Sequence, residues 1–449
     1  MRKVITYGTF DMFHYGHERL LIRAKSLGDY LIVGVTSKSY DEDRGKLNVS
    51  QSLVQRVESV KKTGLADEII IEEYEGQKIN DILSYGIDLF VVGSDWNGKF
   101  DYLKKYCEVT YLERTKGISS TQIRKDINGL IKIGICGPGR IARRFLEESK
   151  YVSGFHVIGA YGSNLDSTRK FVEDNDLEFY EEDFDSFIKK IDAIYISSPH
   201  LSHYEYTKKA LLNGKHVLCE KPITLSKNET IELYELASKK NLVLLEAIKT
   251  AYCPGFINLI NLVRTGVIGD VKIIDATFTK IALPESRELS KNARGGSVTE
   301  LSSYPLLLFN KILGENYSDV SYYSWLNKEK IDLFTKITLI YSNAIATGKV
   351  GVGLRTEGDC IITGTKGYIY VPSPWWKTQF FEVRLNDEDH TQRHFSKFEK
   401  DGLRYELSEF LSMITKGDLV SYKLNSRDSI FISEIIETFL YGKKNHYFD

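Results

Sequence analysis

The sequence predicts an α/β protein with two doubly wound, Rossmann-like domains in tandem, followed by an α+β domain with a largely antiparallel sheet. From its start, short apolar segments alternate with amphipathic ones, which is typical of parallel strands joined by crossover helices. This rhythm restarts at a glycine-rich turn near residue 137. After Pro254 the apolar runs become longer and alternating, as antiparallel strands require. We therefore expect three domains, at residues 1–129, 130–252 and 253–449.

The elements of each domain follow from these patterns. In the first domain we expect helices at 17–28 and 77–86 and strands at 3–8, 30–36, 68–73 and 88–94. A helix-stop signal at Asn128-Gly129 ends this domain. In the second domain we expect strands at 131–136, 155–163, 192–199, 215–222 and 241–247. In the third domain the alternating runs lie at 270–283, 334–353 and 359–373.

Composition excludes several classes of function. The 449 residues contain 60 basic and 61 acidic side chains, so the formal charge of -1 gives no general attraction to nucleic acid or to a membrane surface. The five cysteines show no CxxC spacing, which argues against a disulfide framework and a zinc ribbon and favours reduced, buried thiols. No charged leader precedes an apolar run, and no apolar run reaches about 20 residues. We expect a cytoplasmic protein without membrane insertion.

Two segments of the first domain suit phosphate groups. The stretch "GTFDMFHYGH" places His14 and His17 between a predicted strand and the start of the following helix. The N-terminus of a helix favours anions. The alternative is that both histidines only cap the helix. The stretch "ERTKGISST" places Arg114 beside a glycine turn and three hydroxyl groups at the start of another helix, which predicts a second phosphate cradle.

Residues 2–128 resemble the glycerol-3-phosphate cytidylyltransferase family of HxGH nucleotidyltransferases. The HxGH signature is His14-Tyr15-Gly16-His17, and the Arg-Thr-x-Gly-Ile-Ser stretch of the family is found at Arg114 to Ser119. The segment "VVGSDWNGKFDYLKKYCEVTYLERT" is also similar to the family. The HxGH motif is shared with adenylyltransferases, whereas the other two segments point to CTP.

The resemblance implies an in-line attack by a substrate phosphate oxygen on the α-phosphorus of CTP, with release of pyrophosphate and no covalent intermediate. Such catalysis is mainly positioning and charge stabilisation. By resemblance, His14 and His17 contact the triphosphate, while Asp11 orients either the surroundings of the acceptor phosphate or a Mg2+ ion. Charge neutralisation falls to Lys46 and Arg114, and the helix-terminus cradle to Ser119, Ser120 and Thr121. Further nucleotide contacts are expected at Gly8, Thr9, Phe10, Asp95, Thr115, Gly117 and Ile118.

Three of these expectations have open alternatives. Lys46 lies in the charged segment "DEDRGKLNVS", where a lysine is more often solvated. Arg56 occupies the position of a substrate-contacting arginine in the family, but an arginine on a helix is usually exposed. Tyr74 stands where the family has a tryptophan that shapes the acceptor site. The acceptor is therefore either glycerol phosphate or a longer polyol phosphate.

The second domain begins with a dinucleotide-binding fingerprint. Gly137-x-Gly139-x-x-Ala142 follows a predicted strand and opens a helix, with Arg140 and Ile141 inside the motif. About 20 residues on, where NAD-selective sites have an acidic residue, this chain has Ser163 and Asn164. Basic side chains nearby in the sequence are Arg140, Arg169 and Lys170. We expect NADP(H) to be favoured over NAD(H).

Residues 131–449 resemble the Gfo/Idh/MocA oxidoreductases. The stretch "SSPHLSHYEYTKKALLNGKHVLCEKP" matches the central signature of that family and ends in Glu220-Lys221-Pro222. The resemblance implies cofactor contacts from Ser198, Pro199, His200, His203, Glu220, Lys221 and Pro222. A second stretch, "RGGSVTELSSYPLLLFNKILG", resembles the helix that carries the catalytic pair, here Glu300 and Tyr304.

The same resemblance assigns roles to this pair and to Lys221. Four residues apart on one helix, Glu300 and Tyr304 share a face. Tyr304 is expected to donate the proton, Lys221 to polarise the carbonyl and lower the pKa of Tyr304, and Glu300 to orient the substrate. The chain departs from the family at Glu300, which is more often Asp, and at Ser303, which is more often Gly.

Together these features predict a bifunctional cytoplasmic enzyme. It would reduce a ketose or aldose phosphate to a polyol phosphate and convert this with CTP and Mg2+ to a CDP-polyol for teichoic-acid or capsule polymers. Partners would be these small molecules and further copies of the chain in a dimer or tetramer, with no nucleic acid. Two alternatives remain open: the oxidoreductase half is catalytically silent, or it acts on the CDP-linked product.

Overall fold

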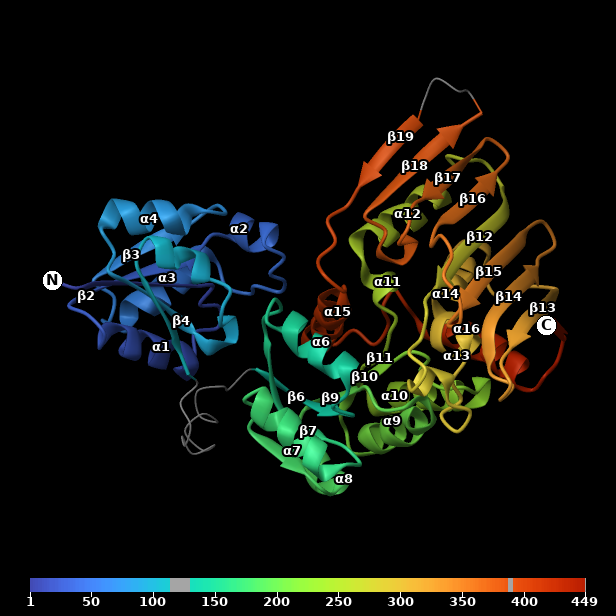
Figure 1. The fold of residues 1–449 in the computed structure, drawn as a ribbon, viewed down its shortest axis with the longest axis horizontal. Coiled ribbons are helices and arrows are strands. Elements are labelled where there is room, and N and C mark those ends of the chain that lie inside the picture. The colour runs from blue at the N-terminus through green and yellow to red at the C-terminus, as the bar shows by residue number, and fades with distance from the viewer. Residues whose placement is uncertain (114–129, 387–390, 449) are drawn as a thin grey trace. The chain divides into compact units, whose positions relative to one another are not determined.

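The computed structural model describes residues 1–113, 130–386 and 391–448, and the chain divides into two compact units (Figure 1). The first unit spans residues 1–131 and takes in the short segments 150–156 and 173–178. The second unit comprises residues 132–149, 157–172 and 179–449. The predicted boundary at Asn128-Gly129 lies outside the described residues.

The first unit contains a five-stranded parallel sheet in the order β3-β2-β1-β4-β5. Its strands are β1 (Lys3–Gly8), β2 (Tyr30–Thr36), β3 (Glu68–Glu72), β4 (Leu89–Gly93) and β5 (Glu108–Leu112). Its helices are α1 (Tyr15–Lys25), α2 (Lys38–Asp43), α3 (Leu53–Lys62), α4 (Gln77–Tyr85) and the 3-10 turns η1 (Ser94–Trp96) and η2 (Asp101–Lys105). Successive side chains of β1 point to opposite faces of the sheet. Val4 therefore packs against α1 and α3 on one face, while Ile5 packs against α4 on the other.

The second sheet has the order β11-β10-β9-β6-β7-β8, which is the doubly wound arrangement that the sequence predicts. Its strands are β6 (Ile131–Cys136), β7 (Phe155–Tyr161), β8 (Phe179–Glu181), β9 (Ala193–Ile196), β10 (His216–Glu220) and β11 (Leu244–Ala247). The accompanying helices are α6 (Arg140–Ser149), α7 (Leu165–Asp174), α8 (Phe184–Ile188), η3 (His200–Ser202), α9 (His203–Leu212) and α10 (Lys227–Lys240).

The third sheet confirms the predicted change to antiparallel strands. Its order is β19-β18-β17-β16-β12-β15-β14-β13-β20, and the pairs β12–β15 and β13–β20 are parallel. The strands are β12 (Val271–Thr279), β13 (Asp319–Leu326), β14 (Asp332–Ile340), β15 (Ile345–Gly351), β16 (Cys360–Gly364), β17 (Gly367–Val371), β18 (Phe380–Leu385), β19 (Thr391–Phe395) and β20 (Asn445–Phe448).

Helices cover one face of this sheet and bring the chain back to the dinucleotide fold. They are α11 (Lys249–Tyr252), α12 (Pro254–Arg264), η4 (Arg287–Leu289), α13 (Ser297–Leu301), α14 (Ser303–Leu313), η5 (Trp375–Lys377), α15 (Leu403–Lys416) and α16 (Ser426–Leu440). The helices α13 and α14 contact β15, while α15 contacts α6 and β10 (Figure 1). Residues from the two ends of the second unit therefore meet near β10.

Two further expectations bear on the environment of the chain. All five cysteines are free thiols, but the prediction that all are buried is wrong for Cys107, which is partly exposed. None of the helices in the described ranges is long and apolar enough to cross a membrane.

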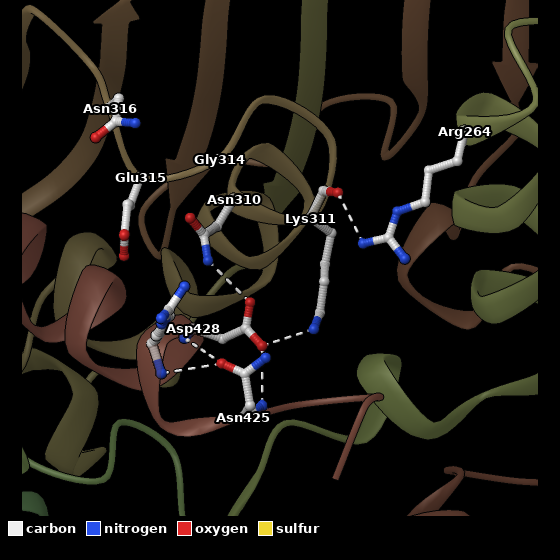
Figure 2. Close-up of a pocket in the computed structure, with 9 residues that line it drawn as sticks. Arg264, Asn310, Lys311, Gly314, Glu315, Asn316, Asn425 and Asp428 are labelled. Carbon is white, nitrogen blue, oxygen red and sulfur yellow. Dashed lines mark hydrogen bonds and ion pairs between the residues drawn. The ribbon is translucent and has the colours of Figure 1, made fainter. Parts of the chain in front are cut away.

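A buried polar cluster ties the end of α14 to the start of α16 (Figure 2). The Asp428 carboxylate accepts hydrogen bonds from Asn310 Nδ2 (2.8 Å), Lys311 Nζ (2.6 Å) and the Asn425 backbone N–H (2.9 Å). The side chains of Lys311 and Asp428 are 7% and 4% exposed. Removing one partner of a buried ion pair leaves the other charge uncompensated, which is the costly way to break such a pair.

We therefore expect Lys311→Met to lower the free energy of unfolding of the second unit by about 3–5 kcal/mol. Urea unfolding followed by tryptophan fluorescence would measure it in a Trp96→Phe background, because Trp325, Trp375 and Trp376 all lie in this unit.

The matched control is Lys444→Met, whose exposed pair with Asp319 (3.0 Å, 59% and 52% exposed) should contribute less than about 1 kcal/mol. Equal losses in the two variants would contradict the assignment of Lys311 to the stability of this unit.

Candidate active sites

The two histidines of the HxGH motif form the N-terminal cap of α1, directly after β1. His14 is the N-cap, and its side chain accepts a hydrogen bond from the Gly16 N–H (3.1 Å). In return, His17 Nδ1 accepts from the His14 N–H (3.4 Å), and the two rings stack with centroids 3.9 Å apart. Capping therefore does occur, and it fixes both imidazoles beside the helix terminus, where an anion is favoured.

His17 is held in its neutral form. Burial, the adjacent His14 and the cation of Lys46 all lower the pKa of His17 well below the usual value. A neutral imidazole at this position keeps one ring nitrogen as an acceptor for the His14 N–H. Lys46 Nζ itself donates to the Lys150 carbonyl oxygen (2.7 Å), and its charge-neutralising role stays a prediction.

A charged cluster that the sequence analysis missed surrounds Thr9. Arg44 NH2 donates to Thr9 Oγ1 and Asp41 Oδ1, both at 2.5 Å. Arg56 is fully buried and donates from NH1 to the carbonyl oxygens of Thr9 (2.7 Å) and Thr36 (2.9 Å). Its Nε and NH2 atoms have no hydrogen-bond partner among the described residues.

This cluster corrects two readings of the sequence. The expectation of an exposed helix arginine is wrong for Arg56, because Asp41 and two strand-end carbonyls compensate its buried charge. The segment before Lys46 is not all loop, because Ser37 caps the helix α2 with its side chain. Arg44 follows α2 directly. The sequence analysis did not single it out, because it lies in a run of charged residues.

Asp11 holds a loop in place. Its carboxylate accepts from the backbone N–H groups of Ser50 (3.0 Å) and Gln51 (2.8 Å), and the side chain is 7% exposed. Each carboxylate oxygen accepts one of these backbone N–H groups, and the two predicted roles of Asp11, orientation of the acceptor site and binding of Mg2+, stay predictions. Within the described ranges no three His, Cys, Asp or Glu residues are arranged to hold a metal ion.

The other predicted residues of the first unit lie at strand ends or outside the described ranges. The buried Phe10 ring contacts His17 (centroids 5.4 Å apart), and a Cβ at Gly8 would lie 3.0 Å from the Phe10 ring. Asp95 is on η1, after β4, and the half-exposed Tyr74 follows β3. Outside the described residues are Arg114, Thr115, Gly117, Ile118, Ser119, Ser120 and Thr121.

The glycine turn after β6 suits a dinucleotide. Gly137 has φ +93°, and a Cβ there would lie 2.4 Å from the Ser198 backbone nitrogen, so only glycine allows β6 and β9 to end so close together. A Cβ at Gly139 would meet nothing within 4 Å, which leaves open space beside the N-terminus of α6. Ile141 lies in the first turn of α6 and is partly buried. These features fit a pyrophosphate group.

The end of β7 carries no acidic side chain. Ser163 is exposed, and Asn164 Oδ1 accepts from the Ser167 N–H (2.9 Å) at the start of α7. Arg140 is 73% exposed and lies 2.9 Å from Glu288 Oε1. Arg169 and Lys170 are exposed on α7.

The residues after β9 and β10 form a bonded layer. His203 is buried, with Nδ1 2.9 Å from Pro222 O and Nε2 2.8 Å from Ser198 O. Burial lowers its pKa to about 4, although both carbonyl groups favour the protonated ring. Pro199 precedes η3, which begins at the buried His200. These contacts hold the loop after β9 against the Lys221-Pro222 segment.

Lys221 contacts the backbone of Glu300, and both residues of the predicted catalytic pair are buried. Lys221 Nζ donates to the Glu300 carbonyl oxygen (2.7 Å), and Glu300 and Tyr304 are 4% and 7% exposed. The predicted single helix is instead split between α13 and α14 at Ser302. Pro305 explains the break, because it has no N–H for the carbonyl four residues earlier.

The expected lowering of the Tyr304 pKa is wrong for this structure. Burial, together with the nearby Glu220 and Glu406, raises the pKa of Tyr304. Burial also lowers the pKa of Lys221, against the effect of Glu300 and Glu220. The phenol is therefore protonated at neutral pH, but its raised pKa makes it a weaker acid than an ordinary tyrosine.

Glu406 on α15 is a buried acid that the sequence analysis did not find. It is 0% exposed, and neither carboxyl oxygen has a hydrogen-bond partner among the described residues. Burial and the neighbouring Glu220 raise its pKa well above the usual value, so the protonated form is favoured. It lies about a hundred residues after Tyr304 in the sequence, so no local pattern could have linked the two.

Models of known families match three parts of the chain. A cytidylyltransferase-like model matches residues 5–126, and a model of the oxidoreductase family with an NAD-binding Rossmann fold matches residues 131–247. A model of the GFO/IDH/MocA C-terminal domain matches residues 256–370.

Individual relatives agree with these models. The glycerol-3-phosphate cytidylyltransferase of Bacillus spizizenii is 54% identical over 130 residues, which are 29% of this chain and 100% of the relative. The trans-1,2-dihydrobenzene-1,2-diol dehydrogenase of Xenopus tropicalis is 26% identical over 318 residues, 68% of this chain and 96% of the relative. The structure of KijD10, a 3-ketoreductase from Actinomadura kijaniata in complex with NADP and TDP-benzene, has the same fold (TM-score 0.64, 21% identity) over 71% of this chain and 100% of that one.

The environment of His17 gives a testable pKa. We expect the His17 ring to titrate below its ordinary value of about 6.5, and Lys46→Met to raise that pKa because a nearby cation is removed. Titration of 13C-labelled histidine rings by NMR would measure both, with His17→Gln as the assignment variant. Lys25→Met, at the last residue of α1, is the matched control and should leave the His17 pKa unchanged. A midpoint at or above 6.5 in the unsubstituted protein would contradict the neutral form.

Proposed function

Because this chain belongs to the cytidylyltransferase-like family in its N-terminal part and to the Gfo/Idh/MocA oxidoreductases in the remainder, we propose that it reduces a sugar phosphate and then activates the product as a CDP-polyol. It is an enzyme of both classes, a nucleotidyltransferase and an oxidoreductase. The observation that carries the proposal is that one chain holds both the HxGH helix cap and the Lys221–Glu300–Tyr304 group. CDP-polyols of this kind would supply teichoic-acid or capsule polymers.

The proposal assigns three parts of the chain to three tasks. Residues 1–129 would transfer CMP, residues 130–252 would bind NADP(H), and residues 253–449 would bind the substrate. The glycine turn at Gly137 and Gly139 supports the second task, since it leaves room for a pyrophosphate beside α6.

In the transferase step, a phosphate oxygen of the polyol phosphate attacks the α-phosphorus of CTP. A new phosphorus–oxygen bond forms, the bond from the α-phosphorus to the bridging oxygen breaks, and pyrophosphate leaves. His14 and His17 would bind the phosphates at the N-terminus of α1, while Lys46 and Arg114 would neutralise the growing charge. Mg2+ would accompany CTP and neutralise part of the triphosphate charge.

In the reductase step, the bound NADPH supplies the hydride. Tyr304 would donate its phenolic proton to the carbonyl oxygen of the substrate, and Lys221 would polarise that oxygen. The carbonyl thereby becomes a hydroxyl group, while the phosphate of the substrate is unchanged. Glu300 would orient the substrate hydroxyls. The Tyr304 phenol is protonated before the reaction, as a donor must be, and Lys221 would lower its raised pKa as the substrate oxygen takes up the proton.

The two activities should be separable. We expect His17→Ala to abolish pyrophosphate release from CTP and to leave NADPH oxidation nearly intact, and Tyr304→Phe to do the reverse, because each residue lies in a different compact unit and sites without shared partners act independently. Pyrophosphate release and NADPH absorbance, measured with a panel of ketose and aldose phosphates, would check this. Loss of both activities in either folded variant would contradict two autonomous sites, and an unsubstituted enzyme that oxidises no NADPH with any sugar phosphate would favour the silent-module alternative.

Mixing the two variants tests the order of the reactions. If polyol phosphate is the intermediate, the mixture should form CDP-polyol from sugar phosphate, CTP and NADPH, as detected by mass spectrometry. Authentic polyol phosphate should bypass Tyr304→Phe and give CDP-polyol directly. If it does not, while CTP is needed before any NADPH is oxidised, the reductase acts on the CDP-linked compound and the proposed order is wrong.

Cofactor preference gives a further prediction. Since no acidic side chain follows β7, we expect NADPH to bind more tightly than NADH, and Ser163→Asp to reduce this preference at least tenfold by placing a negative charge near the ribose. Fluorescence titrations with both cofactors would measure the ratio. Ser238→Asp, exposed on α10, is the matched control and should keep the preference of the unsubstituted protein. Equal affinities in the unsubstituted protein would mean that NADP(H) is not favoured.

A further inference from the structure

Arg287 lies against the catalytic group without belonging to it. The residue opens η4, and its NH2 atom lies 3.3 Å from Glu300 Oε1. The side chain of Arg287 is 39% exposed, whereas that of Glu300 is 5% exposed. Glu300 Oε1 has no hydrogen-bond partner among the described residues, so the ion pair is loose. The guanidinium can therefore turn its donors toward a bound anion without breaking a hydrogen bond to Glu300.

A second cation lies next to this pair. Lys280, which follows β12, places Nζ 2.8 Å from Glu288 Oε1, and its side chain is 35% exposed. The same oxygen accepts a hydrogen bond from Arg140 NH2 (2.9 Å). One carboxylate, 8% exposed, thus faces two cations. Burial raises the pKa of Glu288, but the pairs with Lys280 and Arg140 outweigh it and lower the pKa, so Glu288 is ionised.

The charges of this region do not balance. Arg140 and Lys280 pair with the Glu288 carboxylate and Arg287 with that of Glu300, while a fourth cation, Lys221, bonds the backbone carbonyl of Glu300. Glu220 is a third carboxyl group, bonded to the Tyr195 hydroxyl (2.7 Å), and burial raises its pKa. The adjacent His200 is neutral, because burial and the cations Arg287 and Lys221 lower its pKa. The region therefore carries an excess of one to two positive charges, which matches a phosphate monoester.

The position of Arg287 separates a substrate phosphate from the phosphates of the cofactor. Arg140 follows Gly139 at the start of α6 and so lies on the cofactor side. Arg287 instead contacts Glu300, four residues before Tyr304. Lys280 follows the strand whose Phe278 ring packs against the Tyr304 ring, with centroids 4.9 Å apart. Arg287 is thus tied to the side of the proton donor, whereas Lys280 lies between the two sides, because Lys280 Nζ and Arg140 NH2 contact the same oxygen of Glu288.

We propose that Arg287 and Lys280 bind the phosphate group of the compound that the reductase reduces, an inference that rests on the function proposed above. Guanidinium groups bind phosphate through two parallel hydrogen bonds, and an ammonium group adds a point charge. The substrate class is then a phosphorylated carbonyl compound, and these two side chains distinguish it from the unphosphorylated sugar.

The test compares kcat/KM for a ketose phosphate with that for the same ketose without phosphate. The probes are dihydroxyacetone phosphate, ribulose 5-phosphate and xylulose 5-phosphate with their free ketoses. We expect Arg287→Met and Lys280→Met each to reduce the ratio of the two kcat/KM values about tenfold or more, which is the loss of a hydrogen bond to a charged group. Arg287→Lys should keep part of the ratio, because it retains the charge. Lys349→Met, exposed on β15, is the matched control and should behave as the unsubstituted enzyme does.

Three outcomes would overturn the inference: the ratio is near one in the unsubstituted enzyme, Arg287→Met lowers both kcat/KM values equally, or its effect falls on the KM for NADPH instead. If the unsubstituted enzyme reduces neither a ketose phosphate nor an aldose phosphate, the proposed function fails and the anion site is tested separately. Inorganic phosphate is then titrated into the enzyme–NADPH complex, and the fluorescence of the bound NADPH reports on this site alone. Phosphate binding that weakens at least tenfold in Arg287→Met supports the anion site, and no binding or equal binding overturns it.

Discussion

Both sites depend on one constraint of parallel sheets, the point at which the strand order reverses. Strands on either side of this point send their following loops to opposite faces, so the ends of the two central strands are left for ligands. In the first sheet the point lies between β1 and β4, which are followed by His14 and Asp95. In the second sheet it lies between β6 and β9, followed by Gly137 and Ser198. These motif residues thus lie at the strand ends where the topology leaves backbone groups available to a ligand.

Buried charge prepares each site before any ligand arrives. In the first unit Asp41 compensates Arg44 and Arg56, whose guanidinium groups hold Thr9 and Thr36. In the second unit Glu288 and Glu300 compensate Arg140, Lys280 and Arg287. Charges of this kind are costly to bury unless they are paired. In both units the named cations outnumber the carboxylates that pair with them, so positive charge is left at each candidate site.

The sequence predicted the architecture and the central strands of the sheets, since these depend on local patterns, but it did not predict the strands β5, β8, β13, β18, β19 and β20. Strand ranges from 3–8 to 359–373 follow from apolar periodicity, and the HxGH and glycine turns follow from residue types at fixed spacing. Residues that a distant or unmarked part of the sequence contributes to a site could not be predicted as members of that site. Arg44 resembles any arginine in a charged loop, and Glu406 reaches β10 from α15. The break at Ser302 is a different case. Pro305 made it predictable from the sequence, but the resemblance to the family motif led to the prediction of one continuous helix.

Under the proposed order, the phosphate is first the group by which the reductase binds its substrate and then the nucleophile of the transferase reaction. Reduction at Tyr304 changes a carbonyl into a hydroxyl and leaves the phosphate intact. The reduced and the unreduced compound therefore carry the same charge, and the transferase cannot distinguish them by charge alone. A transferase that bound only the phosphate would also activate the unreduced sugar. Discrimination therefore requires a group in the first unit that hydrogen-bonds the new hydroxyl, because an unpaired polar group in a binding site rejects the analogue that lacks its partner. Tyr74, half-exposed at the end of β3 and carrying a hydroxyl, is suited to this task.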